Sequence, residues 1–63
     1  METKDQPPLD IRQEVFRQLV ESQDRGVPVL QSRSQMESQF SLSAEQVQLI
    51  EREGLNKSWP PLS

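Results

Sequence analysis

The sequence contains no cysteine, no histidine and no tyrosine. Without cysteine the chain has neither a disulfide nor a thiol nucleophile, and without histidine it has no imidazole base or metal ligand. Glycine is also scarce, because Gly26 and Gly54 are the only two and each stands where we expect a helix to stop. No glycine-rich phosphate loop is present. We therefore expect a protein that is not an enzyme, binds no metal ion and needs no cofactor.

Long apolar runs are missing as well. The longest, such as Val29-Leu30 and Leu49-Ile50, have two residues and are far shorter than the roughly 20 residues that a membrane-spanning helix needs. Residues 1–8 are polar, end in Pro7-Pro8 and lack the apolar segment of a secretory signal, so we expect them to form a disordered lead-in. These features predict a cytoplasmic protein that does not bind a membrane.

The charge balance is acidic. Ten acidic residues against seven basic ones give a formal net charge of -3, with an isoelectric point near 4.7. Compact nucleic-acid-binding domains usually present a basic face, so this composition disfavours nucleic acid as a partner. At 63 residues the chain has room for one small domain with a thin core, and too little for an enclosed pocket of about 300 Å³.

A first helix is predicted over 11–25. Apolar residues recur there with the 3.6-residue period that places them on one helix face. They are Ile11, Val15, Phe16, Leu19 and Val20. Asp10 and Gln13 have the spacing of an N-terminal capping box, and Gly26 can adopt the left-handed conformation that ends a helix.

A second, shorter helix follows. Ser32 and Gln35 have capping-box spacing, and the helix is expected to end near Phe40 or Ser41. An alternative start remains open, because Pro28 can occupy the first position of a longer helix.

A third helix is predicted over 44–53. Ser43 and Gln46 form the clearest capping box of the chain. Gly54 would stand one residue past the helix end, with Leu55 in contact with Ile50. The three segments predict an all-α fold, a three-helix bundle over 9–59 that is followed by an extended Trp-Pro-Pro tail over 60–63.

The segment from residue 36 to residue 50, M-E-S-Q-F-S-L-S-A-E-Q-V-Q-L-I, resembles the helix-turn-helix motif of bacterial proteins. Its apolar residues are spaced to close a wedge between two crossing helices. They are Met36, Phe40, Leu42, Val47 and Ile50. The tract from Phe40 to Ser43 is similar to the F-G-L-S turn of that family, with Ser41 in place of glycine, and Glu37 stands where a small residue is usual. The resemblance implies a three-helix domain that binds DNA or another protein.

The outward face of the third helix carries the candidate contact residues. They are Ala44, Glu45, Gln48, Leu49 and Arg52. Gln48 and Arg52 are residue types that read base edges in the major groove, but three acids against one base over 44–53 would repel phosphates. An apolar Leu49 on this face favours a protein partner.

The tail segment Trp59-Pro60-Pro61-Leu62 has two interpretations. In the first, Trp59 folds back onto the core beside Leu55 and Leu49 and adds a large buried surface. In the second, Trp59 and Leu62 are presented to the groove of a partner as a short extended segment.

Together these patterns predict a small non-enzymatic module, helix-turn-helix-like, that mediates protein–protein interaction in a regulatory role. The main alternative is a DNA-binding transcriptional regulator that acts as a dimer or within a larger complex. A third hypothesis is a structural homodimer that associates through a stripe containing Phe16 and Val20.

Overall fold

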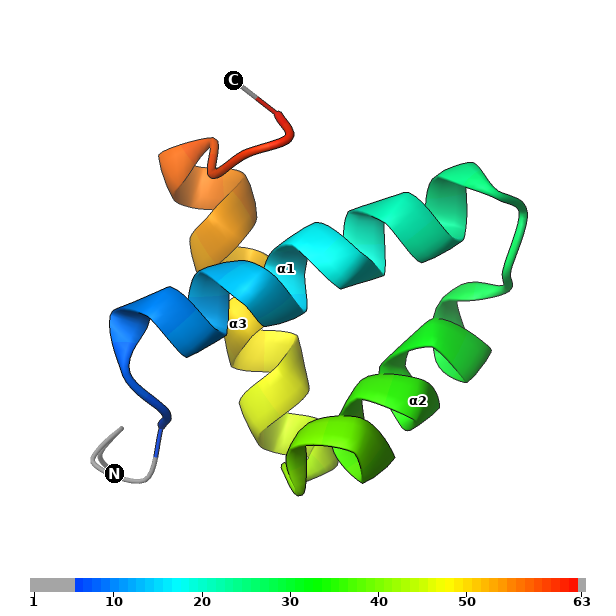
Figure 1. Cartoon of the computed structure of the whole chain (residues 1–63), viewed down its shortest axis with the longest axis horizontal. Helices are drawn as coiled ribbons and strands as arrows, with labels where there is room; N and C mark the ends of the chain where they lie inside the picture. Colours follow the sequence, from blue (N-terminus) through cyan, green and yellow to red (C-terminus); the bar gives the residue numbers. More distant parts are fainter. Residues whose placement is uncertain (1–5, 63) are drawn as a thin grey trace.

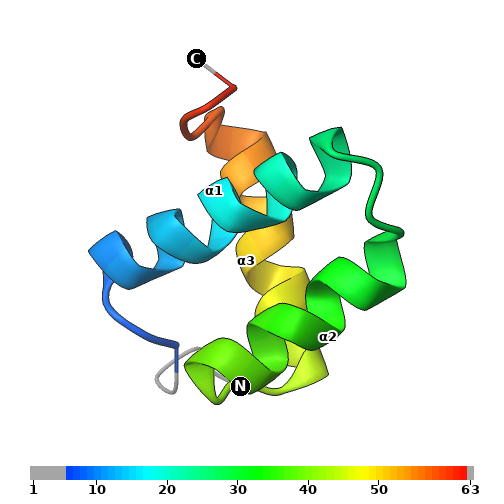
Figure 2. The same ribbon diagram turned by 45° about the vertical axis from the view of Figure 1, so that its right-hand side comes forward.

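Three α-helices make up the secondary structure of residues 6–62, the part of the chain that the computed structural model describes. They are α1 (Leu9–Asp24), α2 (Val29–Phe40) and α3 (Ala44–Lys57). α1 crosses in front of α3 (Figure 1), and after a turn of 45° α2 lies in front of the first half of α3 (Figure 2). Each helix contacts the other two. The predicted all-α three-helix bundle is confirmed.

The core lies where the three helices meet. Its buried apolar residues are Val15, Phe16, Leu19, Met36, Val47, Ile50 and Trp59. Four half-buried residues pack against it, namely Ile11, Val20, Phe40 and Leu42. The five residues of the 36–50 segment that were expected to close the wedge all belong to these two groups. Phe16 is only 1% exposed, so the surface expected to carry a homodimer through Phe16 and Val20 is not formed.

The start of α1 differs from the prediction. α1 begins at Leu9 with Pro8 at the N-cap, and no side chain caps it. Asp10 accepts a hydrogen bond from the neighbouring N–H of Ile11 at 2.9 Å, so the predicted capping box is wrong. Pro8 has a φ of -56°, which the proline ring fixes close to the helical value. The end agrees with the prediction, because Gly26 follows α1 with a φ of 94°.

α2 begins close to the longer of the two predicted alternatives. Pro28 is its N-cap, and Ser32 lies inside the helix. Ser32 is 0% exposed, and its hydroxyl oxygen has no hydrogen-bond partner. The helix ends at Phe40, as predicted, and Ser41 adopts the left-handed conformation with a φ of 57°. That conformation costs a non-glycine residue about 1–2 kcal/mol.

Replacing Ser32 with alanine is expected to raise the free energy of unfolding by about 1 kcal/mol. The substitution removes a buried hydroxyl without a partner and introduces a better helix former. Urea denaturation followed by circular dichroism measures the change. Ser34→Ala on the exposed side of α2 is the matched control, with an expected gain of only about 0.5 kcal/mol from helix propensity. A loss of about 1 kcal/mol in Ser32→Ala, as for a capping serine, would contradict the observed helix start.

α3 has the predicted start and a later end. The Ser43 hydroxyl accepts from the N–H of Gln46 at 3.1 Å, and the Gln46 side chain accepts from the N–H of Ser43 at 2.8 Å. The capping box is therefore confirmed. The helix does not stop at residue 53, because it continues through Gly54 to Lys57 and ends where Ser58 adopts a φ of 53°.

Gly54 serves close packing rather than helix termination. A Cβ at this position would lie 2.3 Å from Cδ1 of Phe16, so only glycine lets α3 approach the ring of α1 this closely. Because the helix continues past Gly54, Leu55 points outward and is 58% exposed. The predicted contact of Leu55 with Ile50 is therefore wrong.

Candidate functional site

The outward face of α3 exposes most of the candidate contact residues. Ala44, Glu45, Gln48 and Arg52 are exposed, and Leu49 is half-buried. The capping box fixes where α3 begins, and the 3.6-residue period then sets which side chains share a side of the helix.

The structure brings two of these residues together in one cleft. Gln48 and Arg52 line a cleft of about 380 Å³ with Leu55 and Glu51 of α3 and with Arg33 of α2. The cleft is open to solvent and lies along the side of α3 that faces α2. It combines one exposed apolar side chain, Leu55, with a rim of polar and charged side chains.

Leu49 belongs to a different cleft. With Gln6, Arg12 and Glu53 it lines a hollow of about 270 Å³ on the side of α3 that faces α1 and the N-terminal segment. The predicted face is therefore divided: Gln48 and Arg52 lie on one side of α3, and Leu49 lies on the other.

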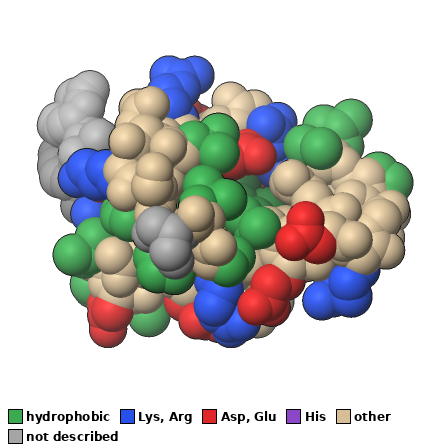
Figure 3. Space-filling model, turned by 90° about the horizontal axis from the view of Figure 1, so that it is seen from above, with side chains coloured by type: hydrophobic (Ala, Val, Ile, Leu, Met, Phe, Trp, Pro, Cys, Tyr) green, Lys and Arg blue, Asp and Glu red, His purple; other side chains and the backbone are tan. Residues whose placement is uncertain are grey.

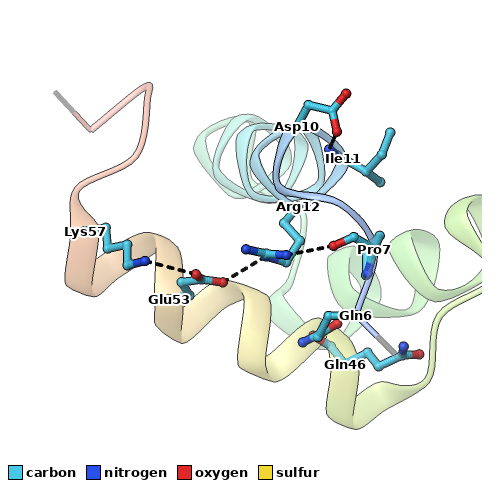
Figure 4. Close-up of polar contacts among 8 residues, drawn as sticks. All are labelled: Gln6, Pro7, Asp10, Ile11, Arg12, Gln46, Glu53 and Lys57. Carbon is cyan, nitrogen blue, oxygen red and sulfur yellow. Dashed lines mark hydrogen bonds and ion pairs between the residues drawn. The ribbon is translucent and has the colours of Figure 1, made fainter. Parts of the chain in front are cut away.

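Residues 6–8 are held against the helices. The guanidinium of Arg12 donates to the carbonyl of Pro7 at 2.7 Å and to Oε1 of Glu53 at 3.1 Å (Figure 4). The Gln6 side chain donates to the carbonyl of Gln46 at 3.4 Å. Disorder was predicted for residues 1–8, of which 1–5 lie outside the described range, whereas Gln6 and Pro7 are half-buried against α1 and α3.

The acidic residues of α3 bind the cations that surround them. Arg33 of α2 pairs with Glu51 at 2.7 Å, and both side chains are largely shielded, at 28% and 18% exposure. Glu53 pairs with Arg12 at 3.1 Å and with Lys57 at 3.3 Å. Glu51 thus faces α2, and Glu53 faces α1. In the described part of the chain, the cations without a carboxylate partner are Arg25 and Arg52.

Sequence reasoning missed Arg33 and Leu55 as members of the cleft. Leu55 follows Arg52 by three residues and Gln48 by seven, which is the spacing of one helix side. The signal was therefore present in the sequence, but the interpretation of Gly54 as a helix stop concealed it. Arg33 was out of reach of sequence reasoning, because its place depends on how α2 packs on α3.

The C-terminal tail follows the first of its two interpretations. Trp59 is 6% exposed, and its ring meets that of Phe16 edge to face, with centroids 6.1 Å apart and planes at 80°. This ring contact joins the tail to α1. Trp59 is thus not presented to a partner, and of the two candidate tail residues Leu62 remains exposed, at 47%.

The tail is also not extended. The N–H of Leu62 donates to the carbonyl of Trp59 at 2.8 Å, which closes a turn over Pro60-Pro61. Seen from above, where the end of α3 and the tail face the viewer, hydrophobic side chains gather in the middle of the surface between basic and acidic ones (Figure 3).

An ion-pair cluster covers the solvent side of α1. Arg17 donates to Glu14 and, at 2.8 Å, to Glu21, and the Gln18 amide donates to Glu14 at 2.8 Å. The hydrogen bonds from Arg17 and Gln18 hold the pKa of the Glu14 carboxyl below its ordinary value of 4.5. The same carboxylates raise the pKa of the Arg17 guanidinium.

Stability is expected to fall in acid partly through Glu14. Because its pKa is lower in the folded state than in the unfolded state, its contribution is complete above pH 4.5 and is lost as the pH falls through the folded-state value. Urea midpoints at about pH 7 and about pH 3 should differ less in Glu14→Gln than in the unsubstituted protein. Asp24→Asn, at an exposed carboxylate without a partner, is the control and should retain the full difference. An unchanged difference in Glu14→Gln would contradict this assignment.

Two further observations concern residues 6–62. No three acidic, histidine or cysteine side chains of this range are grouped closely enough to hold a metal ion. No helix within it combines the length and the apolar composition that a bilayer crossing requires.

Comparisons with protein-family models, with curated proteins and with solved structures find no match to this chain.

Proposed function

We propose that this chain is a small non-enzymatic module, helix-turn-helix-like in its α2–α3 segment, that mediates protein–protein interaction in a regulatory role. Three residues connect α2 to α3, and Leu42 of this connection packs against the core. Met36 of α2 and Val47 of α3 are buried on the inner sides of the two helices. This arrangement supports the helix-turn-helix-like reading and leaves the outer side of α3 open to a partner.

The observation that carries the proposal is the pairing of Arg33 with Glu51 beside the exposed Leu55. A DNA-binding face gains most of its affinity from cations that neutralise phosphates. Here the cation that α2 supplies to the cleft is bound by a carboxylate of α3 at 2.7 Å, and a leucine that is 58% exposed lies next to it. Such a mixture of apolar and paired polar groups suits a protein surface better than a phosphate backbone.

The salt dependence of DNA binding measures how many phosphates a protein neutralises. Binding through Z phosphates has a slope of about -0.9Z in a plot of log K against log salt, so a protein that makes about 6–10 such contacts depends steeply on salt. Among residues 6–62, Arg52 is the one cation of the cleft that has no carboxylate partner. A single contact would give a slope near -0.9 and little affinity.

Capture from the native host tests the proposal. The unsubstituted chain should retain a protein that Leu55→Glu loses, because the substitution places a charge in the apolar part of the cleft. Leu9→Glu is the matched control, since Leu9 is 49% exposed on α1 outside the cleft. The proposal would be wrong if only nucleic acid were recovered, or if both variants retained the protein equally.

Titration with duplex DNA separates the proposal from its main alternative. We expect no shifts in the nitrogen–proton NMR spectrum at α3 when DNA is added at low salt. Gln48 and Arg52 are exposed within one turn of each other and would be the first to respond if α3 entered the major groove. Saturable shifts at these residues that weaken with salt would favour the DNA-binding regulator.

A further inference from the structure

Two exposed charges of opposite sign on α3 have no partner within the described part of the chain. Glu45 lies in the first turn of α3, and Arg52 follows it by seven residues. Neither makes an ion pair, whereas Glu51 and Glu53 are bound by arginines of α2 and α1. The outward side of α3 is therefore left with one free acid and one free base.

The spacing of these charges is self-complementary. Seven residues are close to two helical turns, so Glu45 and Arg52 lie on nearly the same side of α3, about 10 Å apart along its axis. This separation is too long for an ion pair within one helix. The two charges are placed symmetrically about a point between Gln48 and Leu49. A second α3 that runs antiparallel across this point would therefore bring each acid opposite a base.

We propose that α3 is the contact helix of a two-fold symmetric homodimer, in which Glu45 of each copy pairs with Arg52 of the other. Such an interface is isologous, because the same surface contributes from both copies. This inference rests on the proposed function, since it names a second copy of the chain as the partner of the same face.

The remaining residues of the face fit the same register. Leu55, which is 58% exposed, follows Arg52 by three residues and lies at the outer end of the face. Gln48, which carries no charge, lies near the two-fold axis. No like charges come opposite one another, and like-charge contacts are what an interface must avoid. The interface thus combines two ion pairs with an exposed leucine at each end.

Charge reversal tests the register. The unsubstituted chain should dimerise in sedimentation equilibrium, more weakly as salt screens the two ion pairs. Glu45→Arg alone, or Arg52→Glu alone, turns both ion pairs into like-charge contacts and should weaken association at least about tenfold. The double variant Glu45→Arg/Arg52→Glu restores both pairs with their signs exchanged and should restore association. Circular dichroism establishes that each variant remains folded.

Matched controls make the same changes of charge outside the face. Asp24 and Arg25, at the end of α1, are exposed, and their side chains have no partner among the residues that the structure describes, so Asp24→Arg and Arg25→Glu should leave association unchanged. If a charge reversal on α3 lowers the helix content, the neutral variants Glu45→Gln and Arg52→Gln are tested in its place. Each should weaken association, by a smaller factor than a charge reversal would.

Three results would overturn the dimer. They are a monomeric chain up to millimolar concentration, single reversals that behave like the α1 controls, and a double variant that associates no better than the single ones. A monomer that still captures a host protein in a Leu55-dependent manner would overturn the dimer alone and leave the proposed function in place. A monomer that captures no host protein would overturn both the dimer and the proposed function.

Discussion

Replacing Trp59 with alanine is expected to leave most of the protein unfolded at room temperature. Trp59 is 6% exposed and packs edge to face on Phe16, and truncation of a buried tryptophan costs about 3–5 kcal/mol. A domain of this size rarely has a total stability above about 3–5 kcal/mol, so the loss is comparable with the whole. Circular dichroism at 25 °C and a thermal scan measure the helix that remains.

Two variants separate the loss of the ring from a general sensitivity of the tail. Trp59→Phe retains an aromatic ring against Phe16 and should remain folded, with reduced stability. Leu62→Ala changes a residue of the same tail that is 47% exposed, and its melting temperature should stay close to that of the unsubstituted protein. If Trp59→Ala unfolds cooperatively, with a free energy of unfolding within about 1 kcal/mol of that of the unsubstituted protein, the ring is not part of the core.

Gly54→Ala is the second substitution with a large expected effect. An added Cβ would lie 2.3 Å from Cδ1 and 2.5 Å from Cγ of Phe16, whose side chain is enclosed by the core. Overpacking of this kind costs about 1–3 kcal/mol or more, whereas alanine regains about 1 kcal/mol of helix propensity. We expect a net loss of about 2 kcal/mol in the free energy of unfolding, measured by urea denaturation.

A double-mutant cycle assigns this loss to the ring. Phe16→Leu removes Cε1, which the new Cβ would meet at 2.5 Å, and replaces the rigid ring by a smaller side chain that can change rotamer, so Gly54→Ala should be less damaging in that background. Gly26→Ala is the matched control: at Gly26 a Cβ meets nothing within 4 Å, and the cost comes from a φ of 94°. Its effect should be independent of Phe16. Equal coupling of both glycines to Phe16 would contradict the proposed contact.

The apolar periodicity of the sequence was sufficient to predict three helices and most of the core. Met36, Val47 and Ile50 are buried where their spacing places them. The capping box of Ser43 was also predictable, because its hydrogen bonds are local to four residues. The sequence was less reliable where two residues could each mark the start of the same helix. At α2, Pro28 fixes the helix start through its backbone, and Ser32 is left inside the helix.

The predicted ends of the helices show the same limit. Gly26 and Gly54 look alike in sequence, but one ends α1 with a positive φ and the other lies within α3 against a ring from α1. Ser41 and Ser58 take the left-handed positions that were expected of glycine. Which residue ends a helix is thus decided by tertiary contacts that a single sequence does not display.

The candidate face was predicted in part. Glu45, Gln48 and Arg52 are exposed on α3 as their spacing indicates. Leu55 joins the α2–α3 cleft because α3 is four residues longer than predicted. Leu49 lies on the other side of α3, with Arg12 of α1, and this side depends on how α1 packs against α3.

The contact between Phe16 and Trp59 also gives the molecule a built-in spectroscopic reporter. The chain has one tryptophan and no tyrosine, so its intrinsic fluorescence arises from the place where the end of α3 meets α1. Stopped-flow fluorescence would follow the docking of these two helices, while far-ultraviolet circular dichroism would follow helix formation along the whole chain. Coincident time courses would mean that the helices form and dock in a single cooperative step.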